Sequence, residues 1–249
     1  MKEDSPQSND LTTSLNKFIS DTGRCSRREA DKMIEEGRVM LNGVIAKKGN
    51  RAGADDIVLI DGQPLTAQDK AVSKYIAFFK PIGITCTTDQ STPGNIIDCI
   101  QFPERIFPIG RLDKPSEGLI FLTNDGDIVN KILRAGNNHE KEYIVKVHKP
   151  ITEDFIRKMS SGVPILGTYT KKCKVEKINT HSFKIVLTQG LNRQIRRMCD
   201  YLGYEVTSLK RIRIMNIQLD PLEAGQWRLL TDEEVDGLQY LVKDSKKTV

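Results

Sequence analysis

The spacing of apolar residues near the start of the chain predicts two short helices. One face of the first helix is marked by residues at i, i+3, i+4 and i+7, namely Leu15, Phe18, Ile19 and Thr22. Gly23 is suited to end this helix in a left-handed conformation. Ser26 and Glu29 have the spacing of a capping box, which predicts a second helix that stops at Gly37. Residues 1–13 are polar and acidic, and we expect them to form a disordered lead-in without a signal peptide.

A small sheet is predicted directly after these helices. Apolar residues 39–41 and 44–45 flank Asn42-Gly43, the pair typical of a type I′ hairpin. Residues 57–60 predict a further strand, closed by Asp61-Gly62. Together these elements predict a compact module over residues 14–65. The apolar pattern lapses over residues 66–73, which we interpret as a linker.

The pattern of the remaining chain predicts a larger α+β domain over residues 74–243, followed by a tail over 244–249. Strands are expected at 75–79, 143–147, 183–187 and 211–217, without a regular alternation of strands and helices. Thr231 and Glu234 form a second capping-box pattern, which predicts a last helix. We therefore expect a mixed, largely antiparallel sheet.

Composition narrows the class of protein. The chain has 249 residues, of which 38% are hydrophobic and 29% charged, which is enough for a buried core. No run approaches the roughly 20 apolar residues that a membrane span needs, so no membrane partner is expected. The five cysteines and three histidines are scattered. This spacing favours neither a zinc site nor disulfides and suits the reducing cytoplasm, and we expect no metal ligands.

Positive charge is concentrated in two segments. Residues 17–51 hold nine Lys or Arg against five acidic residues, and residues 171–213 hold eleven against three. On a chain whose net charge is only +5, two basic segments indicate binding to phosphates. The alternative is that these side chains are ordinary solvated surface residues.

The first basic segment carries a recognisable motif. It consists of LNK at 15–17, GRCSRREA at 23–30, and GRV at 37–39 running into Asn42-Gly43. These runs resemble the S4 (αL-type) RNA-binding domain, and the resemblance covers residues 14 to about 62. Arg24, Arg27 and Arg28 cluster at a helix N-terminus, where free amides and the helix dipole favour a phosphate. The same patch is expected to include Lys17 and to extend to Lys47 and Lys48. Alternatively, Arg27 and Arg28 are only exposed helix residues.

The run GRLDKPSEGL at 110–119 is the second motif. Asp113 lies there in a Gly- and Pro-flanked loop before the apolar run 119–122, a place more typical of a turn or cap residue than of a catalyst. The run nevertheless resembles the catalytic loop of pseudouridine synthases of the RsuA/RluF family. That resemblance implies that Asp113 is the catalytic aspartate and that its loop neighbour Arg111 binds the substrate. The TNDG turn at 123–126 belongs to the same signature.

Two further segments resemble this family. The first, Lys141-Glu142-Tyr143, opens a strand, and by its pattern alone Tyr143 is a core aromatic residue. The resemblance instead implies that Tyr143 stacks on the target base and acts as a proposed proton acceptor. The run GLNRQIRRM at 190–198 resembles the third active-site motif. Read as a helix, it has an apolar stripe formed by Ile195, Met198, Cys199 and Leu202, with its arginines mostly opposite. We assign Arg196 as the partner of Asp113, with Arg193 as the alternative.

The resemblance extends from residue 14 to about residue 240, and it implies isomerisation of uridine to pseudouridine in structured RNA. Residues 131–137 and 162–174 look most like the RluF type, which modifies large-subunit (23S) ribosomal RNA. The alternatives are small-subunit ribosomal RNA, a transfer RNA, or a non-catalytic S4-domain RNA-binding factor. Members of this branch can carry a long Lys-rich tail, and its shortness here puts tail-dependent RNA affinity in doubt. Without a long apolar seam, we expect a monomer.

The chemistry fits these residue types. The base leaves the ribose through its nitrogen, rotates, and rejoins through a carbon, so nothing is added or lost and no cofactor or metal is expected. The reaction needs an ionised carboxylate beside the sugar, which either attacks it or removes a ribose proton. A cation such as Arg196 beside a buried carboxylate keeps it charged. Stacking on Tyr143 and exclusion of water would keep the detached base bound.

Overall fold

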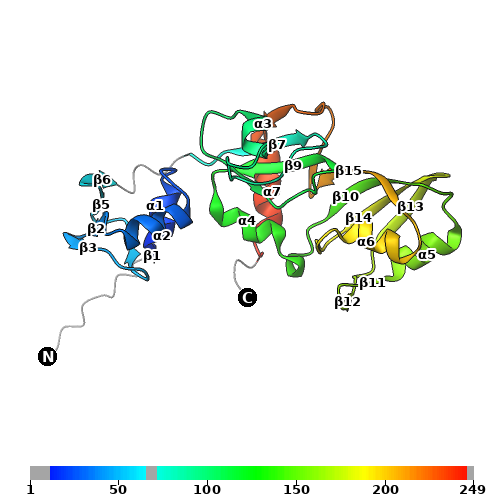
Figure 1. Ribbon diagram of the computed structural model, residues 1–249, viewed down its shortest axis with the longest axis horizontal. Helices are drawn as coiled ribbons and strands as arrows, with labels where there is room; N and C mark the ends of the chain where they lie inside the picture. The colour runs from blue at the N-terminus through cyan, green and yellow to red at the C-terminus, as the bar shows by residue number, and fades with distance from the viewer. Residues whose placement is uncertain (1–11, 66–71, 246–249) are drawn as a thin grey trace. The chain divides into compact units, whose positions relative to one another are not determined.

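The structure of the protein is a computed structural model that describes residues 12–65 and 72–245. The chain divides into two compact units between Ser73 and Lys74 (Figure 1). Most of the predicted lead-in, linker and tail lies outside the described residues, at 1–11, 66–71 and 246–249.

The first unit contains the two predicted helices, α1 (Leu15–Asp21) and α2 (Arg27–Glu35). Gly23 has a φ of +82°, in the left-handed region, directly after the end of α1. The capping box of α2 is confirmed: the Glu29 amide donates to the Ser26 hydroxyl at 3.2 Å, and the Ser26 amide donates to the Glu29 carboxylate at 2.6 Å. Both helices pack on one core with the neighbouring sheet.

The small sheet of this unit is also confirmed. Its strand order is β3-β2-β5-β6, and its strands are β2 (Val39–Leu41), β3 (Val44–Ile45), β5 (Val58–Ile60) and β6 (Gln63–Leu65). Asn42 and Gly43 both have positive φ, +51° and +81°, as the type I′ turn requires. A separate pair joins β1 (Thr13–Ser14) to β4 (Arg51–Ala52). Thr13, which the sequence pattern placed in the disordered lead-in, is therefore part of the fold.

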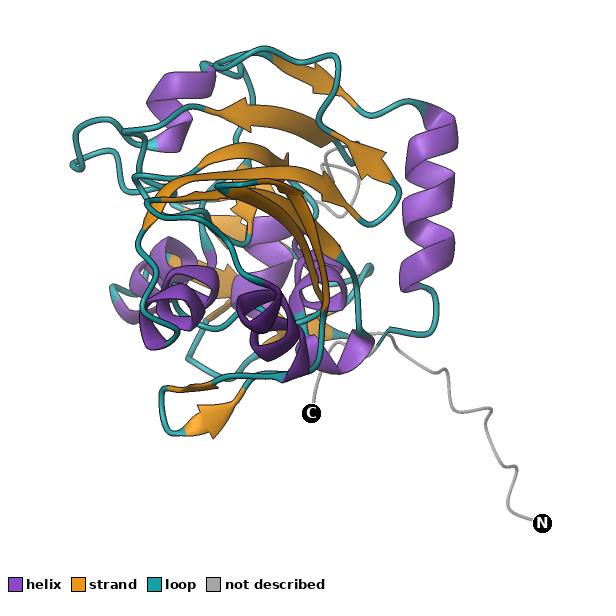
Figure 2. Cartoon of the chain, turned by 90° about the vertical axis from the view of Figure 1, so that its right-hand side faces the viewer, coloured by secondary structure: helices purple, strands orange, loops and turns teal. Residues whose placement is uncertain are grey.

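The second unit is built on one nine-stranded sheet, in which seven strands follow the order β13-β14-β10-β15-β9-β7-β17. The pairs are antiparallel except for β15 with β9, so the predicted α+β class with a largely antiparallel sheet is confirmed. Figure 2 shows how strongly this sheet curves. The strands are β7 (Tyr75–Lys80), β8 (Phe107–Ile109), β9 (Glu117–Thr123), β10 (Lys141–Val147), β13 (Lys174–Asn179), β14 (Ser182–Leu187), β15 (Val206–Ile214), β16 (Ile217–Gln218) and β17 (Trp227–Leu229).

Helices pack on both faces of this sheet, and β7 and β9 are buried on both sides. Alternate residues of β7 show this: Ile76 and Phe78 belong to one core cluster, and Ala77 and Phe79 belong to the other. The first cluster includes residues of α3 (Ile96–Ile100), α5 (Glu153–Ser161) and α6 (Gln194–Tyr201), and the second includes residues of α4 (Gly126–Leu133) and α7 (Asp232–Val242). The remaining elements are the 3₁₀ helix η2 (Ala135–Asn137) and the hairpin strands β11 (Pro164–Ile165) and β12 (Thr168–Tyr169).

Two boundaries differ from the sequence prediction. The strand expected at 211–217 is two strands, because Met215 adopts a φ of +53° and turns the chain from β15 into β16. The apolar residues Ile212, Ile214, Met215 and Ile217 extend across this turn, so hydrophobic spacing alone does not mark it. The helix expected over 190–198 begins only at Gln194, and Arg193 precedes it with a left-handed backbone. Arg193 therefore does not follow the helical face that the pattern assigned to it.

The last helix begins as predicted, with a capping box between Thr231 and Glu234. In the part of the chain that the structure describes, no helix combines the length and the apolarity that crossing a membrane requires.

Candidate functional site

The second unit contains a cavity of about 520 Å³ that brings together the distant motifs of the sequence. Its wall includes the loop 110–114 before β9, the start of β10, the segment 189–193 between β14 and α6, the first turn of α6, and β15. Asp113, Tyr143, Arg193 and Arg196 all line this cavity, and so does Arg111. The sequence motifs are thus far apart along the chain but adjacent in space.

The loop that carries Asp113 is held on both sides of that residue. The Ser116 amide donates to the Asp113 carbonyl at 2.9 Å and closes a turn. The Leu112 amide donates to the Cys86 sulfur at 3.3 Å, and the Gly83 amide donates to the Lys114 carbonyl at 2.8 Å. These backbone contacts position the Asp113 carboxylate at the cavity while leaving its side chain 30% exposed.

Gly118 shows why this loop requires glycine. Its φ is +108°, and a Cβ there would lie 2.2 Å from the carbonyl oxygen of Arg211. Gly118 is the residue that pairs with Arg211 in the parallel contact between β9 and β15. Only glycine permits this approach, so the motif residue Gly118 joins the loop that carries Asp113 to the strand that carries Arg211.

The TNDG turn has a structural role. Asp125 caps α4 by accepting from the Asp127 amide at 2.8 Å, and it also accepts from the Tyr75 hydroxyl at 2.8 Å. Asn124 accepts from the Lys74 amide, and Thr123 donates to the Lys74 carbonyl. The turn therefore fixes the end of β9 against the start of β7.

Two arginines approach Asp113. The Nε atom of Arg196 and the Nη1 atom of Arg193 each lie 3.9 Å from the same oxygen, Oδ2. The sequence named Arg196 as the partner and Arg193 as the alternative; the structure places both beside the carboxylate. The distance alone does not separate their roles, but their surroundings do.

Arg196 is much the more firmly held of the two. Its side chain is 12% exposed, against 47% for Arg193. Its guanidinium donates to the Val206 carbonyl, the Pro115 carbonyl and the Ser116 hydroxyl at 3.1–3.2 Å. Nε, the atom that faces Asp113, is buried and has no hydrogen-bond partner within the described residues. Burial lowers the pKa of Arg196, Arg193 lowers it further, and Asp113 opposes the shift.

Tyr143 lies in the same cavity and is 8% exposed. It shares the buried face of β10 with Val145 and Val147, as the alternation predicted. It also belongs to the core cluster. Tyr143 is therefore both a core aromatic residue, as its pattern predicted, and a residue of the cavity. The guanidinium carbon of Arg211 lies 6.0 Å from the centre of its ring.

The sequence interpretation missed two basic residues of the cavity, Lys141 and Arg211. They are 8% and 4% exposed. Burial and, second, the charge of Arg211 lower the pKa of Lys141 to about 8. Alternation along β10 could have identified Lys141, because it lies two residues before Tyr143 and so on the same face. Arg211 could not have been found this way, because its register with Tyr143 arises only in the sheet.

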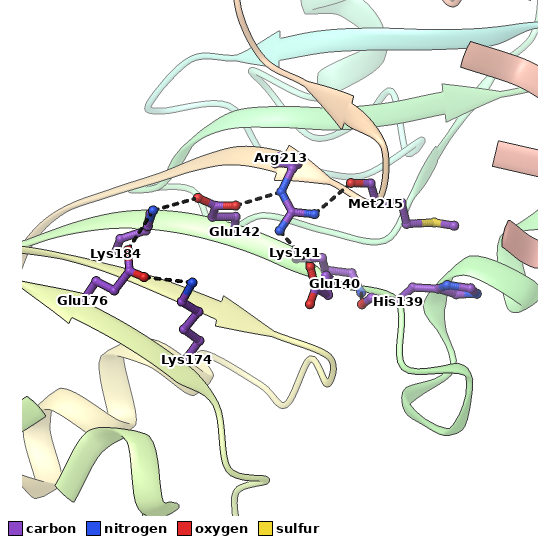
Figure 3. Close-up of polar contacts among 9 residues, drawn as sticks. All are labelled: His139, Glu140, Lys141, Glu142, Lys174, Glu176, Lys184, Arg213 and Met215. Carbon is purple, nitrogen blue, oxygen red and sulfur yellow. Dashed lines mark hydrogen bonds and ion pairs between the residues drawn. The ribbon is translucent and has the colours of Figure 1, made fainter. Parts of the chain in front are cut away.

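The opposite face of the same strands carries a network of ion pairs, shown in Figure 3. Arg213 of β15 contacts Glu142 at 2.7 Å and Glu140 at 2.8 Å. Lys184 of β14 then links Glu142 to Glu176 of β13, which also pairs with Lys174. The two acidic residues that flank Lys141 in the chain are therefore engaged away from it.

The first unit presents its predicted basic patch to solvent. Arg24, Arg27 and Arg28 are exposed, and none of these guanidinium groups forms an ion pair with another described residue. Lys17, by contrast, pairs with Asp21 at 2.5 Å. Lys48 pairs with Glu35, and Lys47 is exposed. The three arginines and Lys47 are thus the exposed charges of the patch that form no ion pair with another described residue.

All five cysteines lie within the described residues, and none of them is joined to another in a disulfide. Over residues 12–65 and 72–245, no three His, Cys, Asp or Glu side chains are grouped so that they could hold a metal ion.

Comparison with known families agrees with this arrangement. The family model described as RNA pseudouridylate synthase matches residues 74–201, and the S4 domain model matches residues 13–58. The chain belongs to the RNA pseudouridylate synthase family, and it is a pseudouridine synthase with an N-terminal S4 domain. The resemblance inferred from the motifs is therefore confirmed.

Individual relatives cover nearly the whole chain. It is 55% identical over 240 residues to the dual-specificity RNA pseudouridine synthase RluF of Escherichia coli, covering 96% of this chain and 83% of that protein. It is 33% identical over 255 residues to the ribosomal large subunit pseudouridine synthase B of Vibrio cholerae, covering 96% of this chain and 78% of that protein. A crystal structure of a pseudouridylate synthase matches with a TM-score of 0.67 and 28% identity, covering 90% and 99% of the two chains.

Proposed function

We propose that this protein converts a specific uridine of large-subunit (23S) ribosomal RNA to pseudouridine, with Asp113 as the catalytic aspartate. The observation that carries this proposal is the position of the Asp113 carboxylate, 3.9 Å from both Arg193 and Arg196 in the cavity that also holds Tyr143. Arg196, with its buried Nε aimed at the carboxylate, pairs with Asp113 as it attacks the sugar or removes a ribose proton.

Each of the other cavity residues has a defined task in this proposal. Tyr143 stacks on the flipped uracil and accepts a proton from it. Arg193 and Arg111, both exposed at the cavity, contact the RNA around the target nucleotide. The isomerisation has no net redox change and transfers no group to or from another molecule, and we assign no metal or cofactor to it. The target base must leave its helix at a cost of a few kcal/mol, which contacts around the flipped nucleotide offset.

The proposed RNA substrate follows from the relatives and the S4 domain. One relative is named for the ribosomal large subunit, and the chain is similar over its length to proteins named RluF. Arg24, Arg27 and Arg28 of the S4 domain hold phosphates of the flanking RNA helix, as part of a monomeric enzyme in the cytoplasm. Because RluF proteins are described as dual-specificity, a second RNA, such as a transfer RNA, is the alternative substrate.

Chemical mapping of pseudouridine tests this proposal. RNA from cells with and without the gene should differ at a site in 23S ribosomal RNA, and the wild-type gene should restore that site. Loss of a site only in small-subunit ribosomal RNA or a transfer RNA would identify that RNA as the substrate instead. If no site is lost and the purified protein releases no C5 hydrogen from labelled RNA, the protein is a non-catalytic RNA-binding factor.

A further inference from the structure

Two buried cations lie beside the proposed catalytic tyrosine. Tyr143 pairs with Arg211 across β10 and β15, and Lys141 precedes Tyr143 by two residues on the same face. Both basic residues line the cavity although they are at least nine-tenths buried. The sheet therefore presents positive charge at the wall where the uracil would stack.

The protein supplies neither of these cations with an acidic partner among the described residues. Arg211 uses Nε to donate to the Leu119 carbonyl at 2.6 Å, whereas its Nη2 is buried and finds no hydrogen-bond partner within residues 12–65 and 72–245. Lys141 donates to the His139 carbonyl at 3.3 Å, which is a long contact. Glu140 and Glu142 are held by Arg213 on the opposite face (Figure 3).

An unpaired buried charge is costly, so this arrangement indicates that a ligand brings the negative charge. The reaction produces such a group inside the cavity. When the bond between ribose C1′ and uracil N1 breaks, its electron pair stays on the base, and the charge spreads over N1, O2 and O4. The bond from C1′ to C5 then forms, C5 loses its proton, and N1 gains one, which balances atoms and charge.

We propose that Lys141 and Arg211 bind the detached uracil as an anion, through its carbonyl oxygens, between bond breaking and bond formation. This inference rests on the proposed function, because it needs the uracil to occupy the cavity beside Tyr143. A half-turn of uracil about the axis through N3 and C6 exchanges N1 with C5 and O2 with O4. Cations that bind one carbonyl oxygen therefore meet the other after the turn, and they can hold the base throughout its rotation.

The chemistry of Lys141 suits this task. Its pKa of about 8 leaves it mostly protonated at neutral pH, and a bound anion would favour the charged form further. In a dry cavity an oriented cation stabilises a developing negative charge far more than it would in water. A phosphate of the RNA backbone is the competing anion, and a change in RNA affinity distinguishes that case.

The test compares Lys141→Met with Lys146→Met, which makes the same change at an exposed position of the same strand. Single-turnover rates are measured at saturating enzyme on total RNA from cells that lack the gene, so the target need not be known. We expect Lys141→Met to slow conversion by roughly 10²- to 10³-fold, the usual effect of removing one preorganised group that stabilises an anion. RNA affinity should stay within about threefold of wild type, and Lys146→Met should convert RNA at the wild-type rate.

A second substrate separates binding of the anion from a structural role. Fluorine at C5 stabilises the uracil anion, so RNA that contains 5-fluorouridine needs less help from the cations. The loss caused by Lys141→Met, measured as consumption of the parent nucleoside, should therefore shrink by roughly tenfold or more on the fluorinated RNA. Arg211→Lys and Lys141→Arg keep the charge and should retain more activity than the corresponding methionine variants.

Three outcomes would overturn the inference. Lys141→Met converting uridine within threefold of wild type would show that the base needs no cation there. Equal losses on the two substrates would indicate a structural role, and a loss of RNA affinity that matches the loss of rate would assign the cations to a phosphate. If the wild-type protein converts no uridine in total RNA, it is the proposed function that fails, and this inference fails with it.

Discussion

Arg24, Arg27 and Arg28 of the S4 domain are exposed to solvent, whereas Lys141 and Arg211 in the wall of the synthase cavity are buried. Arg24, Arg27 and Arg28 have no ion-pair partner among the described residues, and water can solvate them. Lys141 and Arg211 also have no acidic partner there, but they are less than a tenth exposed. Exposed charges attract phosphates from a distance, and salt screens this attraction. Buried charges interact more strongly with a nearby group, because the dielectric constant around them is low. The first region is therefore suited to RNA affinity and the second to chemistry.

Replacing Asp113 should separate these two properties most sharply. Asp113→Asn keeps the size of the side chain but removes its charge, so we expect the single-turnover rate to fall by more than roughly 10³-fold. The variant should bind RNA with wild-type affinity and salt dependence, because the S4 domain is unchanged. A variant that retained a tenth of the wild-type rate would show that Asp113 is not the catalytic residue.

The two arginines beside Asp113 should differ although their distances are equal. Arg196→Met removes a side chain with 12% exposure and three backbone or hydroxyl contacts, and we expect a rate loss on the order of a hundredfold. Arg193→Met breaks an exposed pair worth about 1 kcal/mol or less, so its loss should be roughly fivefold. Thermal unfolding of both variants would check that the fold is intact. If Arg193→Met had the larger effect, the partner role would move to Arg193.

The exposed patch is tested by its salt dependence. Replacing Arg24, Arg27 and Arg28 together with alanine should weaken RNA binding more than roughly tenfold, because each lost phosphate contact lowers the logarithmic salt slope by roughly 0.7 to 0.9. At saturating RNA the single-turnover rate should stay near that of wild type. Titrations at several salt concentrations provide the measurement. An unchanged slope would rule out phosphate contacts by this patch, and normal binding with lost turnover would mean that the domain positions the catalytic unit.

The buried charge of Lys141 should appear in the pH dependence of the rate. Its pKa is lowered to about 8, so the lysine is charged below that pH and neutral above it. The single-turnover rate should fall about tenfold between pH 7 and pH 9, and Lys141→Arg should remove most of that fall because arginine stays charged.

Other titratable groups near Lys141 can be separated from it. Burial raises the pKa of Cys86 and lowers that of His139, which moves both away from pH 8. The remaining charged or titratable residues that line the cavity are Tyr143 and Arg211 on the sheet and Arg111, Asp113, Lys114, Arg193 and Arg196 around it. All of them are unchanged in Lys141→Arg. An identical pH profile in that variant would therefore assign the fall to another group.

Local patterns were sufficient for several elements of this protein, although not for α3, α4, α5, β13 or β17. Capping boxes at Ser26 and Thr231, the Asn42-Gly43 turn and the two-residue alternation of β10 depend on neighbours within a few residues, so the sequence predicts them. The catalytic loop and the arginine motif were found by their resemblance to a family. From pattern alone, Asp113 was a turn residue and Tyr143 a core residue.

Tertiary structure decided which of these residues meet. The bend at Met215, the left-handed backbone of Arg193 and the contact of Gly118 with Arg211 all depend on residues far apart in the chain. Sequence alone named Asp113, Tyr143 and two candidate arginines. The register of the sheet places Arg211 beside Tyr143. The ion pairs of Arg213 on the opposite face hold Glu140 and Glu142 away from Lys141. The physical reason is that burial and partnership are properties of the packed sheet, whereas periodicity is a property of the chain.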